Sequence, residues 1–185
     1  MDFGFVLTKL LVISTLFGNL LTMAFLFFYL VRRPLFDRIA DWLGGYAPII
    51  GLLISLGATL GSLLYSEVVG IPACILCWVQ RAFMYPMMFI FGYALWRKNK
   101  VVFPYTLALT LLGGGVAFYH WVKNMRLAYL HVATPCPAVF TGLPSCDSLD
   151  VFELGYITIP MIALNAFILI ALISWFAMRR ERVIA

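Results

Sequence analysis

The sequence predicts an all-α, polytopic membrane protein. Of its 185 residues, 64% are hydrophobic, compared with ~45–50% in soluble globular domains. Only 11% are charged, and the apolar residues gather in five runs. Each run is long enough for a membrane-spanning helix, which needs ~20 residues to cross a bilayer. This composition excludes an ordinary soluble fold, a disordered chain and a basic nucleic-acid-binding module.

Charged and turn residues mark the end of each apolar run. The first run ends at Arg32-Arg33-Pro34, where proline removes a helix hydrogen bond. Glu67 ends the second run, Lys123 ends the fourth, and basic clusters follow the third and the fifth. The predicted membrane spans are therefore 5–31, 47–66, 75–96, 101–122 and 159–178.

The first span carries a single charge, Lys9, and we interpret it as a retained anchor. A secretory signal peptide is the alternative, but the span lacks a basic n-region and is longer than an ordinary signal h-region. In the second span, Gly57 and Gly61 have the GxxxG spacing that allows two helices to approach closely.

Basic residues predict the orientation of the spans, because cytoplasmic loops carry an excess of Lys and Arg. Nine of the 13 basic residues follow the first, third or fifth span: Arg32, Arg33, Arg38, Arg97, Lys98, Lys100, Arg179, Arg180 and Arg182. We expect that face to be cytoplasmic, with the N-terminus outside and the C-terminus inside. Residues 67–73 and the segment 123–158 then lie outside, with Lys123 and Arg126 as exceptions to the pattern.

All four cysteines, Cys74, Cys77, Cys136 and Cys146, fall on the predicted outer side. Extracytoplasmic compartments are generally oxidising, so two cysteine pairs there can hold disulfides. Two purely structural bridges are one interpretation, and four cysteines allow three different pairings.

Cys74 and Cys77 form a Cys-x-x-Cys motif at the start of a predicted helix, where the positive end of the helix dipole favours a thiolate. A bridge across so short a loop restrains little chain entropy, so the pair suits redox chemistry better than stapling. Arg81 follows Cys77 by four residues on the same helix face and would stabilise a Cys77 thiolate. A snorkelling anchor is the alternative for this arginine.

His120 is expected close to the outer end of the fourth span. Because imidazole changes charge near neutral pH, His120 is a candidate proton or hydrogen-bond donor to a bound acceptor. A purely interfacial hydrogen-bonding residue is the alternative. We hypothesise that Cys77, Arg81 and His120 converge on one pocket between helices at the outer membrane surface.

The second cysteine pair lies in the long outer segment. Pro135 and Pro137 keep Cys136 extended, which suits an exposed sulfur that is open to attack. A glycine and a proline between Cys136 and Cys146 permit the chain to turn back, so a bridge between these two is sterically reasonable. A structural clip is the alternative.

These residues resemble the disulfide bond formation protein B (DsbB) family, the quinone-linked thiol oxidases of bacterial membranes, and more closely its short-loop, BdbC-like members. Residues 72–81, PACILCWVQR, are similar to the family's Cys-x-x-Cys-x-x-x-Arg signature. Tyr119-His120, the loop pair and residues 155–160 match further features of the family. The resemblance covers residues 46–180.

The resemblance implies a four-helix transmembrane bundle plus one additional N-terminal transmembrane helix. Residues 1–45 would form that helix and a cytoplasmic linker. Residues 46–185 would form the thiol oxidase core, with an extracytoplasmic loop at about 123–158. The location implied is the bacterial cytoplasmic membrane.

The resemblance also implies four catalytic residues: Cys74, Cys77, Cys136 and Cys146. A reduced, DsbA-like thioredoxin-fold oxidase outside the membrane would form a mixed disulfide with Cys136. Cys146 would pass the electrons to the Cys74–Cys77 bridge, because thiol exchange needs a thiolate that attacks an accessible disulfide.

The implied electron acceptor is a quinone, either ubiquinone or menaquinone, which drains the electrons into a membrane pool. Cys77, Arg81 and His120 would bind it, and Cys77 would react with it. Neither a metal nor a nucleic-acid partner is expected.

Other classes stay open. The vitamin K epoxide reductase family also uses a four-helix bundle and two cysteine pairs, although there the helix motif follows the loop pair. A nonenzymatic scaffold whose four cysteines hold a structural metal is a second alternative. A transporter or channel would place charged residues inside the spans, which have none apart from Lys9 and Arg81.

Overall fold

The computed structural model describes residues 3–98, 101–133, 146 and 148–184, with side chains as far as Arg180. Its elements are α1 (Phe3–Val31), α2 (Arg33–Gly45), α3 (Ala47–Leu63), the π-helical turn η1 (Leu64–Val68), α4 (Ile75–Arg97), α5 (Phe103–Leu130) and α6 (Ile159–Ile184). Within these described ranges there is no strand, only a single bridge between Glu153 and Ile157. The predicted all-α fold is confirmed.

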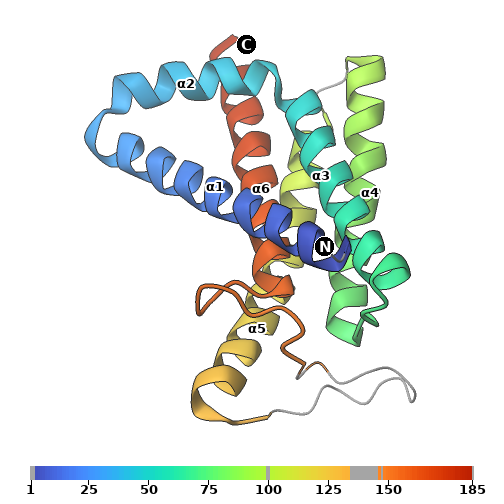
Figure 1. Cartoon of the computed structure of the whole chain (residues 1–185). Coiled ribbons are helices and arrows are strands. Elements are labelled where there is room, and N and C mark those ends of the chain that lie inside the picture. Colours follow the sequence, from blue (N-terminus) through green and yellow to red (C-terminus); the bar gives the residue numbers. More distant parts are fainter. Residues whose placement is uncertain (1–2, 99–100, 134–145, 147, 185) are drawn as a thin grey trace.

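Helices α3 to α6 stand side by side as a bundle, and α1 crosses it obliquely while α2 lies across one end (Figure 1). Helix α6 packs against α1, α2, α3 and α5 and is the centre of the arrangement. Polar side chains join helices inside the bundle, as where the hydroxyls of Thr106 and Ser174 lie 2.8 Å apart between α5 and α6.

Among the residues that the structure describes, four helices are long and apolar enough to cross a membrane: α1, α3 continued by η1, α4, and α6. They coincide with the first, second, third and fifth predicted spans. The fourth span lies in α5, a helix of 28 residues that is not among the four, since Thr106, Thr110, Tyr119 and His120 make it more polar. The chain is thus a multi-pass membrane protein, and its fourth predicted span is a bundle helix that is less apolar than a typical membrane span.

Helix α2 lies where the sequence predicted only a linker. Phe36, Ala40 and Gly44 recur every four residues and are buried, which gives α2 one apolar face. That face rests on α6, where the Arg179 guanidinium pairs with Asp37 at 2.7 Å. Proline at the start of α2 supplies a preset helical φ.

The hydrophobic core lies toward the α2 end of the bundle. Phe36, Phe91, Phe103 and Phe176 are almost completely buried there, and burial of such side chains is the main apolar contribution to packing. A smaller cluster of Leu7, Tyr65 and Val151 holds the opposite end, near the start of α4.

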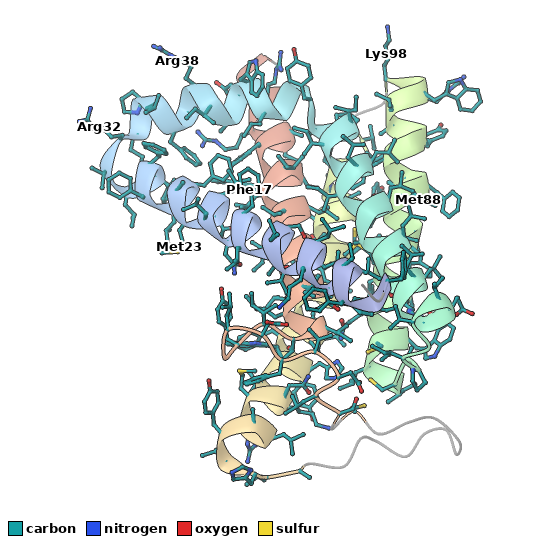
Figure 2. All side chains as sticks on the ribbon, in the orientation of Figure 1. Phe17, Met23, Arg32, Arg38, Met88 and Lys98 are labelled. Carbon is teal, nitrogen blue, oxygen red and sulfur yellow. The ribbon has the colours of Figure 1, made fainter. Side chains whose placement is uncertain are left out.

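Basic residues and cysteines lie at opposite ends of the bundle. Figure 2 shows Arg38 on α2 and Lys98 just after α4 at the same end. Cys74 lies at the opposite end of the bundle, immediately before the first residue of α4. Helix α5 continues to Leu130, so residues 123–130 of the predicted outer loop are helical.

Candidate active site

Cys74 is the N-cap of α4, and its backbone is extended (φ −73°, ψ 172°) while the helix begins at the next residue. Its sulfur accepts a hydrogen bond from the Cys77 backbone N–H at 3.5 Å, as N-cap side chains commonly do. Cys77 lies one turn along, and the two sulfurs are 3.3 Å apart. Both thiols are free, so the motif presents a dithiol whose sulfurs are already adjacent.

Hydrogen bonds from neighbouring groups make Cys74 acidic. Cys74 lies outside the membrane-spanning helix, and the hydrogen bond from the Cys77 thiol is the largest of several causes that lower its pKa from 9.0 to about 4. Burial opposes that shift, whereas His120 and the Cys77 backbone N–H reinforce it. At neutral pH the reduced pair therefore contains a thiolate at Cys74, the nucleophilic form of cysteine.

His120 reaches the dithiol from α5. Its Nε2 atom lies 3.9 Å from the Cys74 sulfur, and its Nδ1 atom lies 3.1 Å from the amide nitrogen of Gln80. Since an amide nitrogen only donates, Nδ1 is the acceptor and a neutral His120 carries its proton on Nε2, facing the sulfur. Gln80 was missed as a site residue, although its position three residues after Cys77 places it near the same helix face.

Arg81 is buried and directs its donors across to α3. Its Nε donates to the Ser62 hydroxyl and its Nη2 donates to the Ser62 carbonyl, both at 2.9 Å. The guanidinium also lies 5.1 Å from the Trp78 ring centroid, within cation–π range. Arg81 thus joins α4 to the end of α3 one turn below the dithiol.

A cavity of about 500 Å³ begins at the dithiol and extends between the helices. Cys74, Cys77, Arg81 and His120 line its polar part, so the structure brings the three residues of the predicted pocket together. Most of the wall is apolar, with Met84 and Phe167 among its residues. This volume lies within the ~300–1,000 Å³ of pockets that bind small organic molecules.

Two buried polar atoms of cavity-lining residues have no hydrogen-bond partner among the described residues: the Tyr85 hydroxyl and the Oδ1 atom of Asn124. The Oδ1 atom of Asn124 is buried and accepts no hydrogen bond there, although Asn124 lines the cavity. A buried acceptor without a donor is costly, so the position suits a ligand that carries a hydroxyl group.

Of the second cysteine pair, only Cys146 is among the residues that the structure describes. Cys146 is buried and disulfide-bonded, whereas Cys136 lies outside the described residues, as do its predicted exposure and its pairing. A disulfide at Cys146 removes a thiolate that the four-cysteine metal alternative requires. Cys74, Cys77 and His120 nevertheless place three ligand atoms within 4.8 Å of one another, a grouping that could hold a metal ion.

The chain is similar to proteins of disulfide bond formation. The family model described as "Disulfide bond formation protein DsbB" matches residues 46–177. A probable disulfide formation protein of Metapseudomonas resinovorans is 39% identical over 128 residues, which cover 69% of this chain and 86% of the relative. The disulfide bond formation protein C of Bacillus subtilis is 36% identical over 118 residues, 64% of this chain and 82% of the relative.

A probable disulfide formation protein C of Bacillus cereus is 32% identical over 136 residues, 74% of this chain and 94% of the relative. No solved structure matches the chain. The family match begins at residue 46, so it includes α3 to α6 and leaves out α1 and α2.

Proposed function

The chain belongs to the disulfide bond formation protein DsbB family, and on that basis we propose that it is a quinone-dependent membrane thiol oxidase. It reoxidises an extracytoplasmic thioredoxin-fold disulfide donor and passes the electrons to a membrane quinone, which supports disulfide bond formation. One observation carries the proposal: the Cys74–Cys77 dithiol faces the same largely apolar cavity as Arg81 and His120. A thiolate and hydrogen-bond donors thus meet where a lipid-soluble acceptor fits.

Electrons arrive at the loop pair. A thiolate of the DsbA-like donor attacks the Cys136–Cys146 disulfide at Cys136 and forms a mixed disulfide, and the donor's second thiol then displaces Cys136 as the donor disulfide closes. The released Cys146 thiolate attacks the Cys74–Cys77 bridge. When Cys136 closes back on Cys146, the loop disulfide is restored and the helix pair holds both electrons as a dithiol. The disulfide-bonded state of Cys146 agrees with this resting state.

The helix pair then reduces the quinone, with Cys77 as the sulfur that faces it. A quinone bound there would take up the two electrons released as the Cys74 thiolate bonds to Cys77. One proton would come from the Cys77 thiol and one from solvent, so that one disulfide would form for each hydroquinone. Arg81 would supply a hydrogen-bond donor to the quinone oxygens and stabilise the negative charge that develops there. The Nε2–H of His120 faces the Cys74 thiolate in the dithiol, and it would become free to donate to the quinone as that thiolate is consumed. The unpartnered Asn124 oxygen would accept a hydrogen bond from a hydroxyl group of the hydroquinone.

The proposed orientation puts the N-terminus outside, the C-terminus in the cytoplasm and the cysteines on the extracytoplasmic side of the bacterial inner membrane. Support comes from the segregation of basic residues: Arg38 and Lys98 lie at the end of the bundle opposite Cys74 (Figure 2). Residues 46–185 form the oxidase core, and residues 1–45 are an extension of it.

The proposal is tested by mixing the purified protein with a reduced thioredoxin-fold oxidase and a soluble quinone analogue while quinone absorbance is followed. The wild type consumes quinone, and Cys77→Ser does not. Ala82→Ser is the matched control, because Ala82 is exposed on the same helix, outside the cavity lining. Quinone consumption by Cys77→Ser at the wild-type rate, or none by the wild type, contradicts the proposal.

Metal analysis separates this function from a metal site at Cys74, Cys77 and His120. The oxidase account predicts that the purified protein carries less than stoichiometric metal and that a chelator leaves quinone consumption unchanged. Stoichiometric zinc, with activity lost on chelation, would favour the metal site.

A further inference from the structure

Helix α1 lies outside the family match, yet it contributes to the wall of the cavity. Leu10, Leu11, Ser14 and Thr15 line the cavity together with the dithiol. Much of the rest of α1 is apolar and exposed, including Phe17 and Met23 (Figure 2). One segment of α1 therefore faces the site, and the helix otherwise suits contact with lipid.

Polar contacts hold α1 in this place. The Tyr65 hydroxyl donates to the Thr8 hydroxyl at 2.9 Å, the Lys9 ammonium pairs with Glu153 at 2.8 Å, and the Asn165 amide donates to Asn19 at 2.6 Å. Inside a bilayer, apolar contact alone does not drive helices together, so interhelical hydrogen bonds and close packing determine their positions.

Packing at Gly18 adds to these contacts. A Cβ atom at Gly18 would clash with the side-chain oxygen of Asn165, so a larger residue there would displace the amide that donates to Asn19. The partners of α1 in these contacts lie in η1 (Tyr65), in the segment before α6 (Glu153) and in α6 itself (Asn165). The position of α1 is therefore specified at several points along the helix.

A slot opens between α1 and α3 beside the cavity. At one end the helices meet, because a Cβ added to Gly61 would lie 3.4 Å from Leu11. One turn earlier in α3, a Cβ added to Gly57 would meet no atom within 4 Å. The lining residues on both sides of this gap are exposed: Leu10 and Ser14 on α1, and Leu53 and Gly57 on α3. In the predicted GxxxG motif, Gly61 thus packs closely against α1, whereas Gly57 faces the opening.

We propose that α1 is a wall of the quinone site and that the slot between α1 and α3 is where the isoprenoid tail of the quinone leaves the cavity for the bilayer. This inference rests on the proposed function, which puts the quinone ring at Cys77 and Arg81. A quinone tail is apolar and stays in hydrocarbon, so a site that encloses the ring needs an apolar lateral opening. The slot joins the cavity to the exposed sides of two helices that are apolar enough to span a membrane.

The test compares a tailless dimethoxy-methyl-benzoquinone with the same ring carrying an isoprenoid tail. Ser14→Trp and Gly57→Leu narrow the slot from its two sides. We expect each to lower the ratio of kcat/KM for the tailed quinone to kcat/KM for the tailless quinone by about tenfold, the scale on which pocket shape discriminates between apolar groups.

Two matched controls distinguish an effect of narrowing the slot from a general disturbance of helix packing. Ile13→Trp introduces the same side chain at an exposed neighbour on α1, and Gly92→Leu introduces leucine into open space on α4. Neither Ile13 nor Gly92 lines the cavity. Both controls keep the wild-type ratio. Size-exclusion profiles and thiol titration show that each variant is folded, and the two slot variants are independent of each other if one fails to fold.

The outcomes separate the two proposals. If the wild type reduces both quinones while the folded slot variants keep its ratio, or if Ile13→Trp lowers the ratio equally, the role of α1 is contradicted and the oxidase function stands. If the wild type reduces neither quinone with a reduced thioredoxin-fold donor, the oxidase function itself is contradicted.

Discussion

The Nε2 atom of His120 lies 3.9 Å from the sulfur of Cys74, although the two residues are 46 positions apart and come from different segments of the bundle. Gln80 orients the imidazole from its other nitrogen, so the proton on Nε2 faces the sulfur. A cysteine at a helix N-cap, a thiol neighbour and a directed imidazole together favour a thiolate. The acidity of Cys74 is thus a property of the assembled bundle and not of the Cys-x-x-Cys motif alone.

Removal of the imidazole tests this relationship. Because a hydrogen bond to a charged group contributes about 1.5–3 kcal/mol, His120→Ala should raise the pKa of Cys74 by about 1 to 2. The pH dependence of Cys74 alkylation in the reduced protein measures it. His131→Ala is the control, since His131 caps the far end of α5. An unchanged alkylation profile in His120→Ala would show that the cap and the Cys77 thiol suffice.

The low pKa of Cys74 also predicts how pH affects the stability of the reduced protein. In the folded state the pKa is about 4, and in the unfolded state it is near 9.0, so between these values the unfolded chain binds more protons. Stability therefore rises as pH increases from about 4 to about 9, and this contribution is lost as pH falls through 4. Thermal unfolding of the reduced wild type should show this slope, which Cys74→Ser should reduce; parallel slopes for the two proteins would contradict it.

The hydrogen bonds of Arg81 predict that alanine substitution of two nearby serines affects quinone reduction differently. Ser62→Ala removes the hydroxyl that accepts from Arg81 Nε, which frees the guanidinium to move from its position at the cavity. We expect kcat/KM for the quinone to fall by about threefold to tenfold, corresponding to one hydrogen bond. Ser66→Ala, where the serine bonds to Glu67 instead, should leave kcat/KM unchanged. Equal kinetics for both variants would exclude a positioning role for Ser62.

Packing of α2 on α6 makes Gly44 sensitive to substitution. A Cβ at Gly44 would lie 2.7 Å from the Phe176 carbonyl oxygen, so Gly44→Ala forces a backbone shift that should cost about 1–3 kcal/mol. The same change at Gly92, where a Cβ meets nothing within 4 Å, should stabilise α4 by about 0.5–1 kcal/mol. Denaturation in detergent checks both, and a stabilised Gly44→Ala would show that α2 does not pack as described.

The pattern of apolar runs predicted where the helices of the bundle begin to within two residues, because a bilayer demands long apolar segments. It did not predict the ends of α5 and α6, which continue past the first charged residues by about one to two turns. Helix α2 was not predicted because its 13 residues form no apolar run of membrane-spanning length. Its signal was the recurrence of Phe36, Ala40 and Gly44 at helical spacing.

The meeting of Cys77, Arg81 and His120 at one cavity was expected from their shared membrane level. In contrast, the Ser62 partner of Arg81, the Gln80 partner of His120 and the place of α1 on the cavity depend on helix packing. Such contacts join residues far apart in the chain, and spacing along one helix does not indicate them.

Electron transfer from the Cys74–Cys77 dithiol to a quinone can be isolated in a single turnover. A variant with Cys136→Ser and Cys146→Ser retains only the helix pair, which can be reduced, freed of reductant and mixed with a quinone analogue without oxygen. The account predicts that two thiols disappear for each quinone reduced, with one Cys74–Cys77 disulfide formed per chain. Persistence of both thiols in the presence of excess quinone would contradict it.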